Sequence, residues 1–167
     1  MVRNMKVLHA VYVGIGIYWS TDAVVEDNKV QVQTTGYTPC RNCANPDRPV
    51  GIELQRGRSG RVLNNDVQVN GALNKQLRGI SVWDNQTSVI DSNNINSTLL
   101  YHYQDFRSAG VDVGNSSHVI VSSNNVTSFQ KAVYVTNSQG VLYRDNTAAF
   151  TSFSPYSGGT DAGGNVP

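Results

Sequence analysis

A repeat with a constant internal spacing is the feature that most constrains how this chain can fold. Five short segments, each a small residue followed by alternating aliphatic positions, recur along the sequence. An asparagine always stands fourteen positions after the first residue of the segment. The segments begin at Gly14, Gly51, Gly79, Gly110 and Ala132, and the asparagines are Asn28, Asn65, Asn93, Asn124 and Asn146. Self-similarity of this kind predicts stacked structural units, each of which buries its apolar side chains against its neighbours.

Each unit is expected to contain three short strands. The first strand is the segment that opens the unit, the second ends three residues before the asparagine, and the third begins just after it. Apolar and polar residues alternate with a period of two in the first and third strands, as half-buried strands require. Composition agrees, because Asn, Ser, Thr, Val and Gly dominate while strong helix formers are few. The chain is therefore predicted to be an all-β coil.

The asparagines have a physical explanation at the turn between the second and third strands. A sharp turn needs one residue in the left-handed backbone region, which asparagine tolerates better than most residues. Stacking then places the asparagine side chains above one another at the strand spacing of about 4.8 Å. Their amides can form a ladder of hydrogen bonds there. We therefore expect left-handed, stacked asparagines.

The loops between units are expected to gather on one face. Successive units begin 37, 28, 31 and 22 residues apart, although the spacing inside a unit is constant. Every insertion must therefore fall between a third strand and the next first strand. The long connections are residues 34–48, 70–78 and 98–108. Loops collected on one face often mark a binding side, and they also drift where nothing selects against them.

The repeat resembles the right-handed parallel β-helix family of pectate lyases, polygalacturonases, alginate epimerases and phage tailspikes, over roughly residues 10–150. The asparagine ladder of that family occupies the same turn. The resemblance implies a right-handed single-stranded parallel β-helix of about five rungs over residues 1–150. The Gly/Ser-rich residues 151–167 would form a tail that drapes the last rung. Function is implied less strongly, because the family shares a coil more than it shares a reaction.

The family's polysaccharide groove runs along the outside of the first strands. On this chain, Glu53 and Asp112 occupy outward positions two rungs apart, which corresponds to about 9–10 Å. That separation lies near the upper end of the range for an inverting glycosidase, so these carboxylates are the predicted catalytic acid/base pair. Tyr18 and Trp83 are expected to stack on sugar rings. A lone Glu and a lone Asp on an exposed strand can equally be solvated surface.

Loop residues add chemistry to the same face. Proton abstraction beside a uronate carboxylate needs a base and a neutralising cation, and residues 101–107 offer both. Arg78 and Arg48 are expected to clamp a carboxylate. The predicted substrate-binding residues are Tyr18, Trp83, Arg78, Tyr101, His102, Asp105 and Arg107.

The catalytic motifs of the family are absent from the sequence. Asn-Thr-Asp, Gly-His-Gly and Asp-Pro-His do not occur, so the choice between a polysaccharide lyase, a glycoside hydrolase and no enzyme stays open. No cofactor is expected. The resemblance to pectate lyases allows calcium, but only Glu53 and Asp112 are available on the first strands. A single CxxC pair, Cys40 and Cys43, lacks the four ligands that zinc requires and is interpreted as a loop staple or two thiols.

A stripe of outward positions on the second strands points to another function. Alternation places aliphatic side chains outside the coil at four rungs, and soluble monomers seldom leave such a stripe uncovered. A homo-oligomer is the expected consequence, unless this strand turns both rows inward. The stripe consists of Val24, Val89, Ile120 and Leu142. The second hypothesis is therefore a structural or adhesive self-associating module, as in tailspikes, or a fragment of a larger β-helix protein.

Charge and hydropathy exclude some partners. Thirteen Lys and Arg residues against twelve Asp and Glu leave a formal charge of +1, so nucleic acid is not an expected partner. The longest apolar stretch, residues 11–19, is too short to span a bilayer, and no secretory signal is recognised. The resemblance implies an extracellular protein. The primary expectation is thus a protein that binds an extended, anionic or neutral, polysaccharide along its first-strand face.

Overall fold

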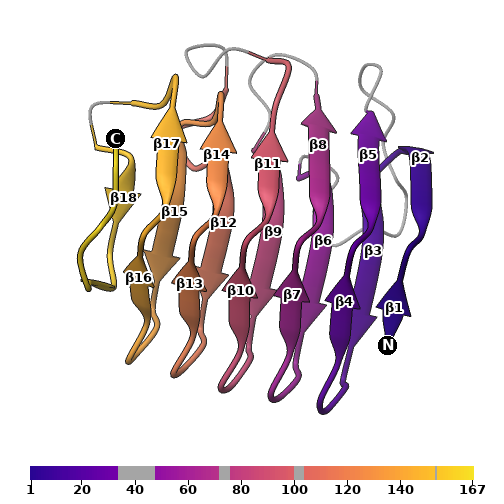
Figure 1. The fold of residues 1–167 in the computed structure, drawn as a ribbon, viewed down its shortest axis with the longest axis horizontal. Coiled ribbons are helices and arrows are strands. Elements are labelled where there is room, and N and C mark those ends of the chain that lie inside the picture. The colour runs from indigo at the N-terminus through magenta and orange to yellow at the C-terminus, as the bar shows by residue number, and fades with distance from the viewer. Residues whose placement is uncertain (34–47, 72–75, 100–103, 153) are drawn as a thin grey trace.

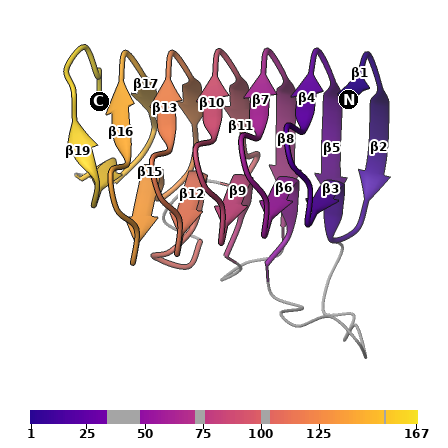
Figure 2. The same cartoon turned by 90° about the horizontal axis from the view of Figure 1, so that it is seen from below.

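The chain forms a right-handed parallel β-helix in the computed structural model, which describes residues 1–33, 48–71, 76–99, 104–152 and 154–167. The described residues contain no helix, and the strands stack into three parallel sheets (Figure 1). The termini lie at opposite ends of the coil (Figure 2). No described segment is a helix long and apolar enough to cross a membrane. The predicted fold class is confirmed, with about six rungs in place of five.

The three sheets correspond to the three predicted strands of each unit. The first-strand sheet contains β3 (Val13–Tyr18), β6 (Val50–Gln55), β9 (Arg78–Trp83), β12 (Ala109–Gly114), β15 (Lys131–Thr136) and β18 (Tyr156–Ser157). The second-strand sheet contains β1 (Val2–Arg3), β4 (Val24–Glu26), β7 (Arg61–Leu63), β10 (Val89–Asp91), β13 (Ile120–Ser122), β16 (Leu142–Arg144) and β19 (Thr160–Asp161). The third-strand sheet contains β2 (Lys6–Ala10), β5 (Lys29–Gln33), β8 (Asp66–Asn70), β11 (Asn94–Asn96), β14 (Asn125–Thr127) and β17 (Thr147–Ala149).

Inward side chains from all three sheets fill the coil. Alternate residues of each strand are buried, and equivalent residues of successive rungs pair in register, as Val25 with Val62 and Ile52 with Ile80. One row of the core, on the third-strand sheet, consists of Val30, Val67, Ile95, Val126 and Ala148. Burial of rows of this kind contributes the main stabilising term of the fold, at roughly 25 cal/mol per Å² of apolar area.

The glycine that opens a rung is required by close packing across the coil. A β-carbon at Gly110 would collide with one methyl group of Val126 and lie 2.9 Å from the other. The last unit carries Ala132 at the equivalent position, and the residue opposite is Ala148 instead of a branched side chain. The two substitutions compensate in volume, which explains why the first residue of a unit is small.

The asparagine ladder forms as predicted and is longer than predicted. Each side-chain amide donates to the Oδ1 of the next asparagine at 2.9–3.0 Å, from Asn28 through to Asn165. Asn165 belongs to the tail, whose β18 and β19 add most of a sixth rung. Tyr156 of this tail stacks on Tyr143 with ring centroids 5.4 Å apart, so the tail covers the end of the core.

The predicted backbone conformation of the asparagines is wrong. The positive φ angles belong to the residue that precedes each of the first five ladder asparagines, with values of 53–57°. These residues are Asp27, Asn64, Ser92, Ser123 and Asp145. The asparagine itself turns its side chain into the coil, where the amide donates to the next rung and to nearby carbonyl oxygens. The sharp turn between the second and third strands therefore uses the residue before each asparagine.

The aliphatic stripe faces outward, as alternation predicted. Val89 pairs with Ile120 and Ile120 with Leu142 in consecutive strands of the second-strand sheet. Ile120 is 37% exposed and Leu142 is 40% exposed, while Val24 and Val89 are half-buried. Arg61 interrupts the stripe between Val24 and Val89.

A substitution in the ladder tests its contribution to stability. The side chain of Asn93 makes five hydrogen-bond contacts: its Oδ1 accepts two from Asn65, and the two N–H groups of its Nδ2 are shared among three acceptor oxygens. We expect Asn93→Ala to lower the free energy of unfolding by about 3 kcal/mol or more, because buried partners lose their hydrogen bonds. The measurement is the urea midpoint. Asn94→Ala, at the exposed first residue of β11, is the control and is expected to cost less than about 1 kcal/mol. Equal losses would contradict the ladder's role.

Candidate functional site

Two rows of side chains line the outer face of the first-strand sheet. Strand pairing brings equivalent outward residues into register across five rungs. The first row is Gly16, Glu53, Ser81, Asp112 and Tyr134, and the second row is Tyr18, Gln55, Trp83, Gly114 and Thr136. The outward rows that alternation predicted are therefore confirmed.

A hollow of about 390 Å³ opens on this face over β3, β6 and β9. Its lining combines aromatic rings, guanidinium groups and one carboxylate. The principal residues are Tyr18, Arg48, Glu53, Arg78, Ser81 and Trp83. The predicted residues Tyr18, Trp83, Arg78 and Glu53 are thus brought together in one concavity, which we call the arginine hollow.

Asp112 lies beneath the neighbouring side chains and has no solvent exposure. Its Oδ2 accepts a hydrogen bond of 2.7 Å from Nε1 of Trp83 and forms an ion pair with Nη1 of Arg78. The Trp83 ring lies over Gly114, where a β-carbon would come within 2.6 Å of the ring. Asp112 therefore fixes the orientation of Arg78 and Trp83, both of which line the hollow.

Glu53 is half-buried and accepts a hydrogen bond of 2.6 Å from the hydroxyl of Tyr18, one rung away. The pKa of Tyr18 is raised to about 12, first by burial, then by this hydrogen bond and then by the negative charge of Glu53. Tyr18 is 41% exposed beside the hollow. Glu53 thus orients an aromatic surface as well as offering a carboxylate.

Three arginines crowd this part of the face. Burial and the charges of Arg48 and Arg107 lower the pKa of Arg78 to about 10, although Glu53 opposes this effect. The pKa of Arg48 is lowered by burial and by Arg107, with Asp105 acting in the opposite sense. Among the described residues, the buried Nε atoms of Arg48 and Arg78 have no hydrogen-bond partner. The site therefore has unused N–H donors and guanidinium groups that repel one another.

The remaining predicted residues divide into two groups. Asp105 accepts hydrogen bonds from the backbone N–H and Nε of Arg107, at 2.9 and 3.4 Å, so these two form a pair at the edge of the site. Tyr101 and His102 lie outside the described residues, as do Cys40 and Cys43. The described residues contain no cluster of three or more His, Cys, Asp or Glu side chains that could hold a metal ion.

The catalytic role of Glu53 and Asp112 stays a prediction. Their strands are separated by β9, which places Ser81 between them in the row. Glu53 is accessible and could accept or donate a proton. Asp112 is fully buried and paired, so the geometry favours a positioning role for its carboxylate over contact with a substrate.

Sequence reasoning missed Trp19, which is 71% exposed next to Tyr18. The centroids of the two rings are 6.0 Å apart, and the guanidinium of Arg56 lies 5.5 Å from the Trp19 ring centroid. The sequence did contain a sign of this exposure, because Trp19 directly follows the first strand and therefore lies in a turn at the surface.

Comparison with known proteins supports the fold alone. A solved structure from Parabacteroides merdae, provisionally assigned as a glycosyl hydrolase, superposes with a TM-score of 0.57 at 11% sequence identity. The match covers 96% of this chain and 79% of that one. A structure of QnrB1, a plasmid-mediated fluoroquinolone resistance protein, reaches a TM-score of only 0.19 at 9% identity, too low to support an argument. No family model and no curated protein sequence matches the chain. The chain is thus a parallel β-helix with an asparagine ladder.

The Tyr18 and Glu53 contact can be tested by titration. We expect ¹³Cζ chemical shifts of tyrosine to show Tyr18 titrating at about pH 12. Glu53→Gln is expected to lower that pKa, because the negative charge that disfavours tyrosinate is removed, while burial keeps it above the ordinary value. An unchanged Tyr18 pKa in Glu53→Gln would show that the two groups do not interact.

Proposed function

We propose that the protein binds an extended anionic glycan along the outer face of its first-strand sheet, with the arginine hollow as the main contact. The single observation that carries this proposal is that one hollow is lined by two arginines, Arg48 and Arg78, together with the aromatic residues Tyr18 and Trp83. A carboxylate or sulfate group accepts charge-assisted hydrogen bonds from guanidinium N–H groups.

Electrostatics supports an anion at this place. Besides burial, the charge of Arg107 lowers the pKa of Arg48, and the charges of Arg48 and Arg107 lower the pKa of Arg78, so an incoming negative charge relieves repulsion at this place. Asp112 forms its ion pair with Nη1 of Arg78, so one of the positive charges at the site is already balanced. A phosphate-rich nucleic acid is not favoured, because the protein as a whole has a formal charge of only +1.

The aromatic rings support a sugar as the carrier of the negative charge. Tyr18 and Trp83 flank the hollow, and both are held by hydrogen bonds to carboxylates. Rings that are fixed before binding lose little conformational entropy when a sugar stacks on them. The parallel rows along the sheet suit a linear chain lying across several rungs. The fold supports the proposal as well, because it also occurs in a protein that is provisionally assigned as a glycosyl hydrolase.

Binding calorimetry with hexagalacturonate tests the proposal. We expect Arg48→Gln to weaken binding about tenfold, because one charge-assisted hydrogen bond is lost. Arg144→Gln, an exposed arginine on the second-strand sheet, is the matched control and should leave the affinity unchanged. Affinity should also fall as salt rises. Equal affinity for hexagalacturonate and its carboxyl-reduced neutral form would overturn the proposal.

Self-association through the aliphatic stripe is the second candidate function. The observation that favours it is the in-register row of Val89, Ile120 and Leu142 on the outside of the coil. A second copy of the same face would cover this row. Polysaccharide binding and assembly are compatible, since they use different sheets.

Light scattering tests the stripe. We expect the protein to sediment and scatter as an oligomer and Ile120→Glu to dissociate it, because a charge would be buried at the contact. Thr147→Glu on the exposed side of the third-strand sheet is the control and should leave the mass unchanged. A monomer at high protein concentration would exclude this function.

A further inference from the structure

A second line of polar side chains runs along the turn that follows the first strand of each rung. The first residue of this turn has a left-handed φ between 48° and 56° in five rungs. The third residue forms parallel bridges from rung to rung, from Thr21 through Arg58, Gln86 and Ser117 to Gln139. Equivalent side chains of the turn are therefore stacked at the strand spacing.

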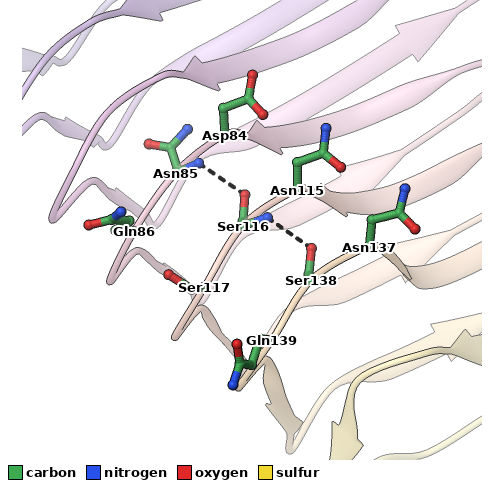
Figure 3. A pocket seen from close by; sticks show the side chains of 9 residues that line it. All are labelled: Asp84, Asn85, Gln86, Asn115, Ser116, Ser117, Asn137, Ser138 and Gln139. Atoms are coloured by element: carbon green, nitrogen blue, oxygen red, sulfur yellow. Dashed lines mark hydrogen bonds between the residues drawn. The ribbon is translucent and has the colours of Figure 1, made fainter.

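Beneath these side chains, the second residues of successive turns form a ladder of hydrogen bonds from rung to rung. The backbone N–H of Asn85 donates to Oγ of Ser116 at 3.1 Å, and the N–H of Ser116 donates to Oγ of Ser138 at 3.0 Å (Figure 3). The side-chain amide of Asn85 donates to the carbonyl oxygen of Leu54 at 2.9 Å. These hydrogen bonds fix the floor of the turn before any ligand arrives.

Two rows of side chains stand beside this floor. Figure 3 shows Asp84, Asn115 and Asn137 on one side of the ladder and Gln86, Ser117 and Gln139 on the other. They enclose a hollow of about 540 Å³. A second hollow of about 530 Å³ shares Asp84 and Gln86 with it and continues to Trp19. We call the two hollows together the turn trough.

The walls of the turn trough carry unused hydrogen-bonding groups. The amides of Gln86, Asn115, Asn137 and Gln139 are exposed, and none has a side-chain hydrogen bond within the part of the chain that the structure describes. Each amide offers both donors and an acceptor. The two arginines of the lining, Arg56 and Arg58, lie at the Trp19 end, and Asp84 lies where the two hollows meet. The half that contains Asn115 and Asn137 is lined by neutral side chains apart from Asp84.

We propose that the turn trough is a second binding site, for a neutral oligosaccharide that lies along the axis of the coil. Paired rows of amides match the hydroxyl groups of a sugar chain, each of which can donate and accept. The exposed ring of Trp19 provides a stacking surface at one end, and the guanidinium of Arg56 lies over one face of that ring. The absence of charge from most of the lining disfavours an anionic chain here and separates this site from the arginine hollow.

The experiment is NMR titration of the labelled protein with neutral hexasaccharides of glucose, mannose, xylose and galactose. Backbone amides of residues 115–117 and 137–139 are expected to shift with at least one of the four. In Asn115→Gly/Asn137→Gly we expect that affinity to fall about tenfold, because two amides are removed. Glycine keeps the left-handed backbone without strain. Hexagalacturonate binding should be unchanged in this variant.

Asn64→Gly is the matched control, since Asn64 is exposed and left-handed in the other turn of its rung. It should bind the neutral hexasaccharide as the unmodified protein does. The proposal is overturned by no shift in the turn trough with any of the four sugars, by shifts confined to β6 and β9, or by equal affinity in the double variant and the control. Failure of hexagalacturonate binding alone would concern the arginine hollow and not this site.

Discussion

The ladder of asparagine amides is the interaction on which the rest of the structure depends. Each inner asparagine uses its side chain to satisfy the backbone of its own turn, the carbonyl oxygens nearby and the asparagine of the next rung. These polar groups are buried at a corner, where water cannot replace a missing partner. The ladder therefore fixes the corner at the same place in every rung. Because strands on both sides of the corner are then in register, side chains of all three sheets are stacked in rows.

Stacking in rows determines the chemistry of the outer surfaces. Stacking turns a single residue type into a line along the coil, so Glu53, Ser81 and Asp112 lie in sequence on one face. The longer side chains then interact across rungs, as Tyr18 does with Glu53 and Trp83 with Asp112. The two carboxylates thus organise the aromatic and basic groups that would contact a sugar. The same stacking arranges the amides of the turn trough, which has different chemistry and lies beside the first face.

The repeat was sufficient to predict the coil, the five ladder asparagines, the outward rows and the position of the insertions. Asn165 was not predicted as a ladder residue, because no segment of alternating aliphatic residues begins fourteen positions before it. The tail builds its rung from shorter strands. Alternation also could not show that Asp112 is buried. Its position is outward, and the long side chains of Arg78 and Trp83 contact its carboxylate from the preceding rung. The left-handed residue was misplaced by one position, because the asparagine is needed inside the coil.

A crystal structure of the protein soaked with trigalacturonate tests the central claim most directly. The account predicts a sugar ring stacked on Tyr18 or Trp83 and a carboxylate within hydrogen-bonding distance of the guanidinium group of Arg48 or Arg78, with Asp112 still paired to Arg78. A sugar bound on another sheet, or electron density for the ligand in contact with Asp112 after Arg78 has moved away, would contradict it.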